Sequence, residues 1–268
     1  MARPAVTVAI RAARAAGSVI LRYMNRLGSV AVIEKHHLDF VSEVDRQAEK
    51  EIVRELRRAY PDHAFLAEEG GASGKAGARY TWVIDPLDGT HNYLRSIPQF
   101  AVSIAQLDHG EPIHAVILDP LRNEIYTASK GDGAFLNDHR IRIGKRDSLD
   151  GALLATGFPY RERQHLDAQL GMTRELLKRA EDIRRAGSAV LDLAWTAVGR
   201  LDGYFETGLK PWDMAAGCLI VREAGGRYCN MVGMDGLPES GNLVAANHRI
   251  AEEIVTAIAP ALTSALKK

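Results

Sequence analysis

The stretch Thr81-Trp82-Val83-Ile84-Asp85-Pro86-Leu87-Asp88-Gly89-Thr90 contains the pattern that decides the fold. Its apolar start predicts a short buried strand, and Asp85 stands at the end of that strand, where a side chain can project into a cleft. Pro86 fixes its own φ and removes a donor from the hydrogen-bond ladder. Asp88 can point back to the same place, with the Leu87 carbonyl between the two acids. The stretch therefore predicts a group of oxygen ligands at a strand end.

The last two residues of this stretch suit an anion. Gly89 lets the backbone approach a ligand closely, and Thr90 offers a hydroxyl. If a helix begins here, the free N–H groups of Gly89 and Thr90 face one point, and such a helix start binds phosphate. One short segment can therefore hold both a cation and an anion.

Carboxylates also occur at the ends of other apolar segments. Glu68 and Glu69 follow a short apolar run, Asp213 follows Trp212, and Asp45 opens a helix. Taken one at a time, each has an ordinary structural explanation as a solvated pair or a helix cap, and the central motif alone can be a capped turn. The functional hypothesis depends on their joint occurrence.

Converging carboxylates repel one another, so their pKa values rise unless a cation offsets the charge. The candidate ligands are all oxygens, which favours Mg²⁺ or Mn²⁺ over Zn²⁺. Sites for phosphate transfer often hold two such ions about 3.5–4 Å apart. No G-x-S-x-G nucleophile motif and no P-loop occur in the sequence.

The hydrophobic periodicity predicts two long helices followed by a meandering sheet in the first half, and an α/β pattern in the second. We place a boundary near residue 145, giving an N-terminal α+β half (1–145) with the metal motifs and a C-terminal α/β half (146–268) that closes the pocket. Residues 72–78, rich in Gly, Ala and Ser, predict a mobile active-site loop. Helices are expected at 4–27, 43–60, 166–180, 188–198, 212–223 and 250–266, and strands at 81–84, 100–107, 113–118, 124–129, 141–143, 203–206 and 243–246.

Composition indicates an ordinary globular protein. The 268 residues have a formal net charge of +0, 46% hydrophobic residues and two cysteines outside any C-x-x-C pair. We therefore expect no strong direct binding to nucleic acid and no zinc site or disulfide framework, and a reducing cytoplasm fits best. No secretory signal and no apolar run near the roughly 20 residues of a membrane span are recognised.

Two signatures, in order along the chain, resemble the inositol monophosphatase family. The first is the stretch 82–93 and the second is the stretch 212–217 with the glycines at 225–226. Supporting matches lie at 44–45, 67–69, 131–134 and 184–189, and the overall texture is similar to the SuhB-like bacterial branch. The resemblance implies a layered α-β-α-β-α sandwich of the sugar-phosphatase type and a homodimer.

The resemblance also implies metal ligands, carried over by motif position. Glu68, Asp85 and the Leu87 carbonyl would hold a first Mg²⁺. A second Mg²⁺ would be held by Asp85, Asp88 and Asp213.

Catalytic roles follow from the same motif positions. Asp45, beside Glu68, would position a third, weaker ion or its waters, and Mn²⁺ can substitute for Mg²⁺. Thr90 and Glu68 would orient the attacking water, while the N–H groups of Gly89 and Thr90 grip the phosphate.

Further positions would contact the substrate. Asp88 and Asp213 reach the substrate as well as the metal, Glu206 would bind a substrate hydroxyl, and Ala189 would line the ring pocket. His91 departs from the threonine of many relatives, and we place it in a supporting or surface position beside the phosphate grip, with contact to the substrate as the alternative. Tyr93 departs from a phenylalanine. Arg184-Arg185 are interpreted as structural or interface ion pairs, with a phosphate grip as the alternative.

The implied reaction is Mg²⁺-dependent hydrolysis of a small polyol or sugar phosphate monoester by water, with inositol 1-phosphate as the first candidate and inhibition by lithium. Relatives that use fructose 1,6-bisphosphate, 3′-phosphoadenosine 5′-phosphate or histidinol phosphate share the metal motifs, so these substrates stay open. A regulatory protein with a partner in transcription antitermination and ribosomal RNA maturation is the alternative from a different class.

Overall fold

The computed structural model describes residues 3–24, 32–36, 39–158 and 163–267, which form two large β-sheets and a small hairpin. The eight-stranded sheet has the order β10-β9-β8-β7-β6-β5-β3-β4 and the five-stranded sheet the order β12-β11-β13-β15-β14. The strands of the larger sheet are β3 (Ala64–Ala67), β4 (Gly71–Gly74), β5 (Tyr80–Asp88), β6 (Ala101–Asp108), β7 (Glu111–Asp119), β8 (Glu124–Ser129), β9 (Gly133–Leu136) and β10 (His139–Arg140). Those of the smaller sheet are β11 (Leu153–Thr156), β12 (Asp182–Arg184), β13 (Gly203–Glu206), β14 (Arg227–Cys229) and β15 (Leu243–Ala246). The hairpin pairs β1 (Val32–His36) with β2 (Asp39–Ser42).

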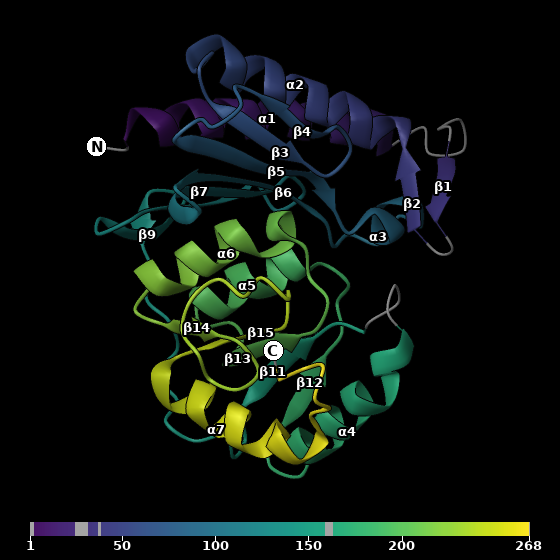
Figure 1. The fold of residues 1–268 in the computed structure, drawn as a ribbon, viewed down its shortest axis with the longest axis vertical. Coiled ribbons are helices and arrows are strands. Elements are labelled where there is room, and N and C mark those ends of the chain that lie inside the picture. Colours follow the sequence, from purple (N-terminus) through teal and green to yellow (C-terminus); the bar gives the residue numbers. More distant parts are fainter. Residues whose placement is uncertain (1–2, 25–31, 37–38, 159–162, 268) are drawn as a thin grey trace.

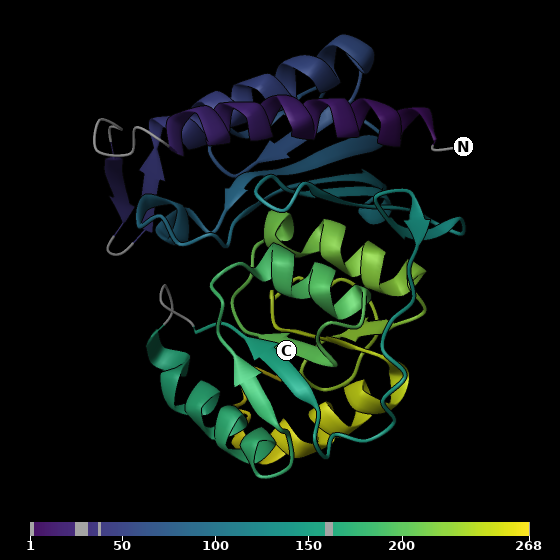
Figure 2. The same ribbon diagram turned by 180° about the vertical axis from the view of Figure 1, so that it is seen from behind.

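The helices and sheets alternate in five layers (Figures 1 and 2). Helices α1 (Pro4–Met24) and α2 (Glu43–Ala59) cover the outer face of the larger sheet. Helices α5 (Ala189–Ala197) and α6 (Pro211–Glu223) lie between the two sheets. Helices α4 (Leu166–Leu177) and α7 (His248–Ile258) cover the far face of the smaller sheet, and α3 (Thr90–Leu94) follows β5. The expected layered α-β-α-β-α sandwich is therefore confirmed.

Small side chains allow the outermost layer to pack closely. In α1 the alanines at 12, 13 and 16 are fully buried, and a Cβ at Gly17 would come 2.9 Å from the Leu118 side chain on β7. By length and composition α1 is apolar enough to cross a membrane, unlike the expectation that no such run exists, and 50% of the relevant window is buried inside the molecule. A core helix made of alanine and valine passes the same test, and here its apolar face packs on the sheet.

Hydrophobic contacts run across the predicted boundary near residue 145. One cluster of buried residues joins Ala105 and Ile117 of the larger sheet to Leu193 of α5 and Leu219 of α6. The last strand of the larger sheet ends at Arg140, and the smaller sheet begins thirteen residues later with β11. The middle helices thus share a core with both sheets, and the division into two domains stays a prediction.

Three expected elements differ in the structure. Residues 72–78 do not line the pocket, and their first part is no loop, because Gly71–Gly74 pair with β3 as the exposed edge strand β4. Gly74 adopts φ +86, and a Cβ there would meet the His63 carbonyl at 2.5 Å. Residues 141–143 are not a strand, since the N–H of Ile143 bonds to the Ala224 carbonyl and leads the chain off the sheet. The last helix ends at Ile258, where a proline follows in a 3₁₀ turn.

Candidate active site

The strand that carries the central motif ends irregularly. Strand β5 pairs with β6 in register up to Asp85, and the pairing resumes at Asp88 after a break that contains Pro86. The Leu87 N–H donates to Asp85 Oδ1 at 3.0 Å, which holds that carboxylate against the turn. The hydroxyl of Thr90 lies 3.0 Å from both the Leu87 carbonyl and Asp45 Oδ1. A single hydroxyl proton can serve only one of these acceptors at a time.

A left-handed glycine connects this strand to helix α3. Gly89 has φ +86, and a Cβ there would approach the Gln99 carbonyl at 2.7 Å. Any other residue would meet both backbone strain and a steric clash. A helix does begin at Thr90, which meets the condition set by the sequence for a phosphate-binding turn, and its first backbone bond runs from the Tyr93 N–H to the Gly89 carbonyl.

The structure brings the predicted acids into one electrostatic neighbourhood. Asp85 is 1% exposed. Its burial, and then the negative charges of Glu68, Asp88 and Asp213, raise its pKa well above the usual range of an aspartate. The four acids are therefore close enough to influence one another's ionisation.

The acids fit a hard cation by their chemistry. In the described part of the chain, no three His, Cys, Asp or Glu side chains are already arranged as a coordination cluster. Asp85 is buried, and three neighbouring acids penalise its ionised form. Together with the Leu87 carbonyl, these carboxylates offer oxygen donors of the kind that suit Mg²⁺.

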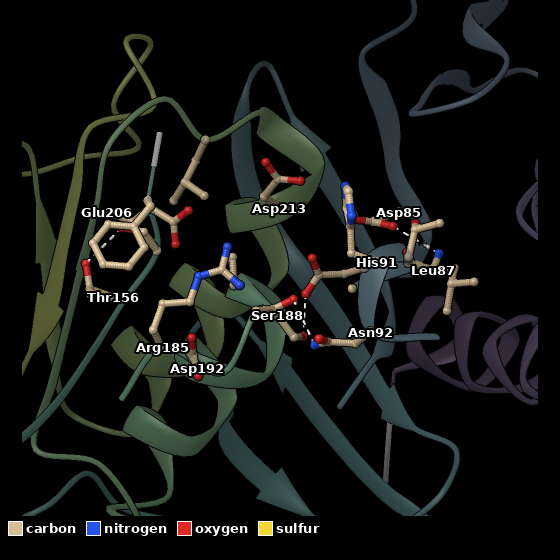
Figure 3. A pocket seen from close by; sticks show the side chains of 18 of the residues that line it. Asp85, Leu87, His91, Asn92, Thr156, Arg185, Ser188, Asp192, Glu206 and Asp213 are labelled. Carbon is tan, nitrogen blue, oxygen red and sulfur yellow. Dashed lines mark hydrogen bonds between the residues drawn. The ribbon is translucent and has the colours of Figure 1, made fainter. Parts of the chain in front are cut away.

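One pocket of about 350 Å³ collects nearly all predicted site residues (Figure 3). That volume is in the usual range for a small-molecule site. Asp45 is not part of the lining, and it reaches the pocket through its hydrogen bond with Thr90. The predicted residues that line the pocket are Glu68, Asp85, Leu87, Asp88, Gly89, Thr90, Ala189, Glu206 and Asp213.

Two of the acids also contact helix N-termini from the second half of the chain. Asp88 Oδ2 accepts from the Ser188 hydroxyl at 2.5 Å and from the Val190 N–H at 2.9 Å, at the start of α5. Asp213 lies in the first turn of α6 and accepts from the Lys210 N–H at 2.7 Å. Asp213 is therefore not the N-cap, which is Lys210, but it completes a capping box from the third position of α6, and it lines the pocket as well.

Glu206 lies in the far part of the pocket at the end of β13. Burial raises its pKa to about 7, although the Tyr204 hydroxyl donates to Glu206 Oε2 at 2.5 Å and opposes that rise. Gly157 lies directly against this carboxyl group, because a Cβ there would overlap the carboxylate oxygens.

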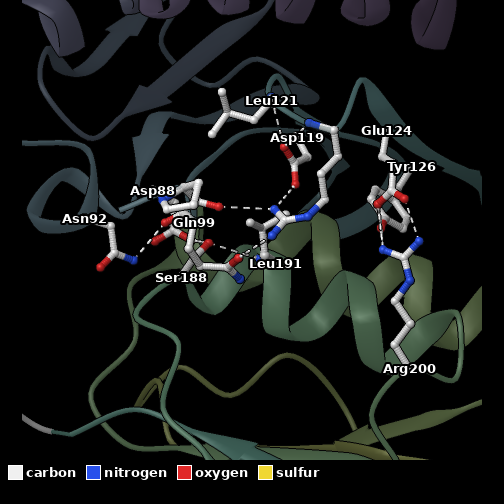
Figure 4. A network of polar contacts seen from close by, with 12 residues as sticks. Asp88, Asn92, Gln99, Asp119, Leu121, Glu124, Tyr126, Ser188, Leu191 and Arg200 are labelled. Atoms are coloured by element: carbon white, nitrogen blue, oxygen red, sulfur yellow. Dashed lines mark hydrogen bonds and ion pairs between the residues drawn. The ribbon is translucent and has the colours of Figure 1, made fainter. Parts of the chain in front are cut away.

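Several pocket residues were assigned no role from sequence. Asn92 donates from Nδ2 to the Gln99 carbonyl at 2.8 Å (Figure 4). It also donates to the Ala186 carbonyl at 2.9 Å, which joins α3 to the turn before α5. Ser188 caps α5 and holds Asp88, and Asp192 also lines the pocket. Two features of the sequence could have indicated these roles: Asn92 comes directly after the central motif, and Ser188 stands at the start of a predicted helix.

The expectations for the unusual residues have mixed outcomes. His91 lines the pocket beside Thr90, so both its supporting role and a contact with substrate stay predictions. Tyr93 is fully buried, and its hydroxyl donates to the Ile20 carbonyl of α1 at 2.8 Å. This hydrogen bond explains a tyrosine at a position where many relatives have phenylalanine. Arg184 pairs with Asp182, as expected for a structural ion pair, whereas Arg185 lines the pocket.

Comparison with known proteins agrees with this geometry. The model of the inositol monophosphatase family matches residues 1–264. The chain is 54% identical over 260 residues to the Nus factor SuhB of Xylella fastidiosa, covering 95% of this chain and 94% of that protein. The crystal structure of extragenic suppressor protein suhB from Bartonella henselae has a TM-score of 0.91 at 39% identity, covering 94% of this chain and 97% of that one. The inositol monophosphatase from Anabaena has a TM-score of 0.86 at 36% identity over 95% of each chain. The chain therefore belongs to the inositol monophosphatase family.

Proposed function

We propose that this protein hydrolyses phosphate monoesters of small polyols or sugars in a Mg²⁺-dependent reaction, with inositol 1-phosphate as the first candidate substrate. The observation that carries the proposal is the burial of Asp85 among Glu68, Asp88 and Asp213, beside the backbone turn at Gly89. A neutral pocket would bind a phosphate ester without activating water, and an acidic pocket without a cation would repel it. The two features together suit a phosphate ester bound with divalent cations.

The metal ligands in this proposal are Glu68, Asp85, the Leu87 carbonyl, Asp88 and Asp213. When bound, Mg²⁺ would supply a water of lowered pKa and would neutralise charge on the phosphate and on the leaving oxygen. The family is generally Mg²⁺-dependent. Competition at one of these positions is the basis for expecting inhibition by lithium.

The remaining residues position the reactants. The Thr90 hydroxyl, held by Asp45 or by the Leu87 carbonyl, is placed to orient the attacking water together with Glu68. The N–H groups of Gly89 and Thr90 would bind the phosphate, because they precede the first internal bond of α3. Binding and alignment of this kind supply most of the catalysis that phosphoryl transfer needs.

No covalent step is included in the proposal. Both cysteines are buried, and burial raises the thiol pKa of Cys218 and raises that of Cys229 to about 11. A thiol that stays protonated is a poor nucleophile. Direct attack by water is the simpler reaction for this set of residues.

The decisive experiment measures phosphate release from a panel of sugar, polyol and nucleotide phosphates, with and without Mg²⁺. The variant Asp88→Asn should lose activity by orders of magnitude, because it removes one ligand charge. Glu239→Gln, at an exposed position that is not part of the pocket lining, serves as the matched control and should keep full activity. Near-normal turnover by Asp88→Asn at saturating Mg²⁺ would contradict the metal assignment.

A second candidate function is a regulatory role in transcription. It is favoured by the similarity to a protein named as a Nus factor, at 54% identity. On this proposal the chain acts in the cytoplasm, as a homodimer or with a protein of the transcription machinery. Normal growth of a strain with Asp88→Asn, combined with failure of a deletion strain, would favour this role over hydrolysis.

A further inference from the structure

The far part of the pocket contains a charged cluster without a role so far. Arg185, Asp192 and Glu206 lie together on the side opposite Asp85 and Leu87 (Figure 3). They come from the turn before α5, from the first turn of α5 and from the end of β13. This cluster faces the place where the alcohol part of a bound phosphate ester would lie, because the phosphate-binding turn is on the other side.

Asp192 is the most unusual member of the cluster. It is 1% exposed, and among the described residues its Oδ1 is buried without a hydrogen-bond partner. A buried carboxylate oxygen without a partner is costly, so such a group needs an explanation. Capping of α5 does not explain it, because Ser188 holds that position and accepts from the Leu191 N–H. A ligand in the pocket would supply the missing donor.

The position of Arg185 is set by the turn that precedes α5. Gly187 has φ +84, and a Cβ there would come 2.8 Å from Arg185 Nη1. The guanidinium therefore lies over the glycine and next to the pocket, where its charge acts on the carboxyl groups of both Asp192 and Glu206. One guanidinium beside two acids leaves no excess of positive charge in this part of the pocket.

We propose that Asp192 is a specificity-determining residue that binds a hydroxyl of the leaving alcohol, next to Arg185 and Glu206, and so selects polyhydroxylated alcohols without a second phosphate. A hydroxyl can donate to a carboxylate and accept from a guanidinium, so neighbouring hydroxyls on one ring satisfy all three side chains. A second phosphate on the alcohol would face the two acids Asp192 and Glu206 with only the Arg185 guanidinium to offset their charge, so its binding would be disfavoured. This inference rests on the proposed phosphatase function and decides between two substrate classes that the metal motifs leave open.

The experiment uses three esters and two variants of Asp192. Inositol 1-phosphate carries the hydroxyls, p-nitrophenyl phosphate lacks them, and fructose 1,6-bisphosphate carries the second phosphate. Asp192→Leu removes the polar group at similar size, and Asp192→Asn keeps a hydrogen-bonding group without the charge. Thermal unfolding of each variant shows that the fold is intact.

We expect Asp192→Leu to lower kcat/KM for inositol 1-phosphate by about tenfold or more, the usual effect of one lost hydrogen bond to a charged group, mostly through KM. The same variant should stay within about twofold of the wild type on p-nitrophenyl phosphate, which makes no such bond. Asp192→Asn should keep most of the activity on inositol 1-phosphate, and both variants should improve on the bisphosphate relative to the wild type.

Two results would overturn the inference. An equal loss on inositol 1-phosphate and p-nitrophenyl phosphate would show a structural role, and no change on any ester would show that Asp192 makes no contact. If the wild type cleaves none of the esters, the proposed function fails separately. Calorimetric titration of inositol into the wild type and Asp192→Leu, with Mg²⁺ and inorganic phosphate present, then decides: tenfold weaker binding by the variant supports the inference, and equal binding or none overturns it.

Discussion

Removal of the Ser188 hydroxyl should weaken the junction between the two halves of the chain. This hydroxyl donates to Asp88 Oδ2 at 2.5 Å and also caps α5 by accepting from the Leu191 N–H at 3.3 Å. Loss of a hydrogen bond to a charged group costs about 1.5–3 kcal/mol. Loss of an N-cap to alanine costs about 1 kcal/mol. Because the Val190 N–H still holds Asp88, we expect Ser188→Ala to lower the free energy of unfolding by about 2–3 kcal/mol.

The two contributions can be separated by a matched variant. Ser188→Gly also removes the hydroxyl, but glycine at an N-cap costs only a few tenths of a kcal/mol, so this variant should be less destabilised than Ser188→Ala. Urea unfolding followed by tryptophan fluorescence is a suitable assay, because Trp82 lies in β5 and Trp212 lies in the first turn of α6, on either side of the junction.

A double-mutant cycle tests the contact itself. Ser188→Ala and Asp88→Ala should show a coupling energy of about 1.5–3 kcal/mol, since the second change has less to remove once the first is made. Additive effects of the two substitutions would refute the reasoning, because they would show that the hydroxyl does not stabilise the Asp88 carboxylate. Ser188→Thr, which keeps a hydroxyl, should retain most of the stability.

Four further changes give measurable outcomes. The folded-state pKa of Glu206, about 7, lies above the usual 4.5, so the contribution of this group to stability is present below about pH 4.5 and is lost as the pH rises to about 7. Glu206→Gln should remove this pH dependence, which is on the order of 3 kcal/mol and is measured by urea unfolding at a series of pH values. Gly157→Ala should raise KM at least about tenfold by displacing the Glu206 carboxylate, while Gly144→Ala, where a Cβ meets its nearest atom at 3.5 Å, should leave KM unchanged. Tyr93→Phe should cost about 1 kcal/mol in unfolding by removing a bond to α1, without altering kcat. Asp85→Asn should raise the Tm measured without divalent cations, because it removes a penalised charge. It should also abolish the increase in Tm that Mg²⁺ gives the wild type. A variant whose Tm still rises with Mg²⁺ would contradict the assignment of Asp85 as a metal ligand.

The parts of the site that local sequence could predict are those set by local backbone rules. The strand before Asp85 and the break at Pro86 depend on neighbouring residues, and the structure confirms both; the helix start after Gly89, which the sequence left as a condition, is also present. The edge strand β4 was missed because glycine and alanine carry a weak strand signal, and only pairing with β3 makes them extended.

The polar surroundings of the site depend on contacts between distant segments. The bond from Ser188 to Asp88 joins residues 100 positions apart, and the bond from Asn92 to the Ala186 carbonyl joins residues 94 apart. Asp192 looks like any acid in a first helical turn until α5 is placed beside β13. Periodicity cannot supply that placement, because it follows from the packing of α5 and α6 between two sheets.

The same helix placement explains why an acidic site is compatible with a stable fold. Helices α5 and α6 pack so that their N-termini meet the acidic end of β5, and the backbone N–H groups and positive helix ends there stabilise Asp88 and Asp213. Asp85 accepts from the Leu87 N–H at 3.0 Å and also shares a hydrogen bond with the Glu68 carboxyl group, and its burial, together with the neighbouring acids, raises its pKa well above the usual range. The fold therefore offsets part of the repulsion among these acids and leaves the charge of Asp85 penalised. A bound cation would relieve this remaining penalty. The uncompensated negative charge therefore increases the affinity of the pocket for a cation.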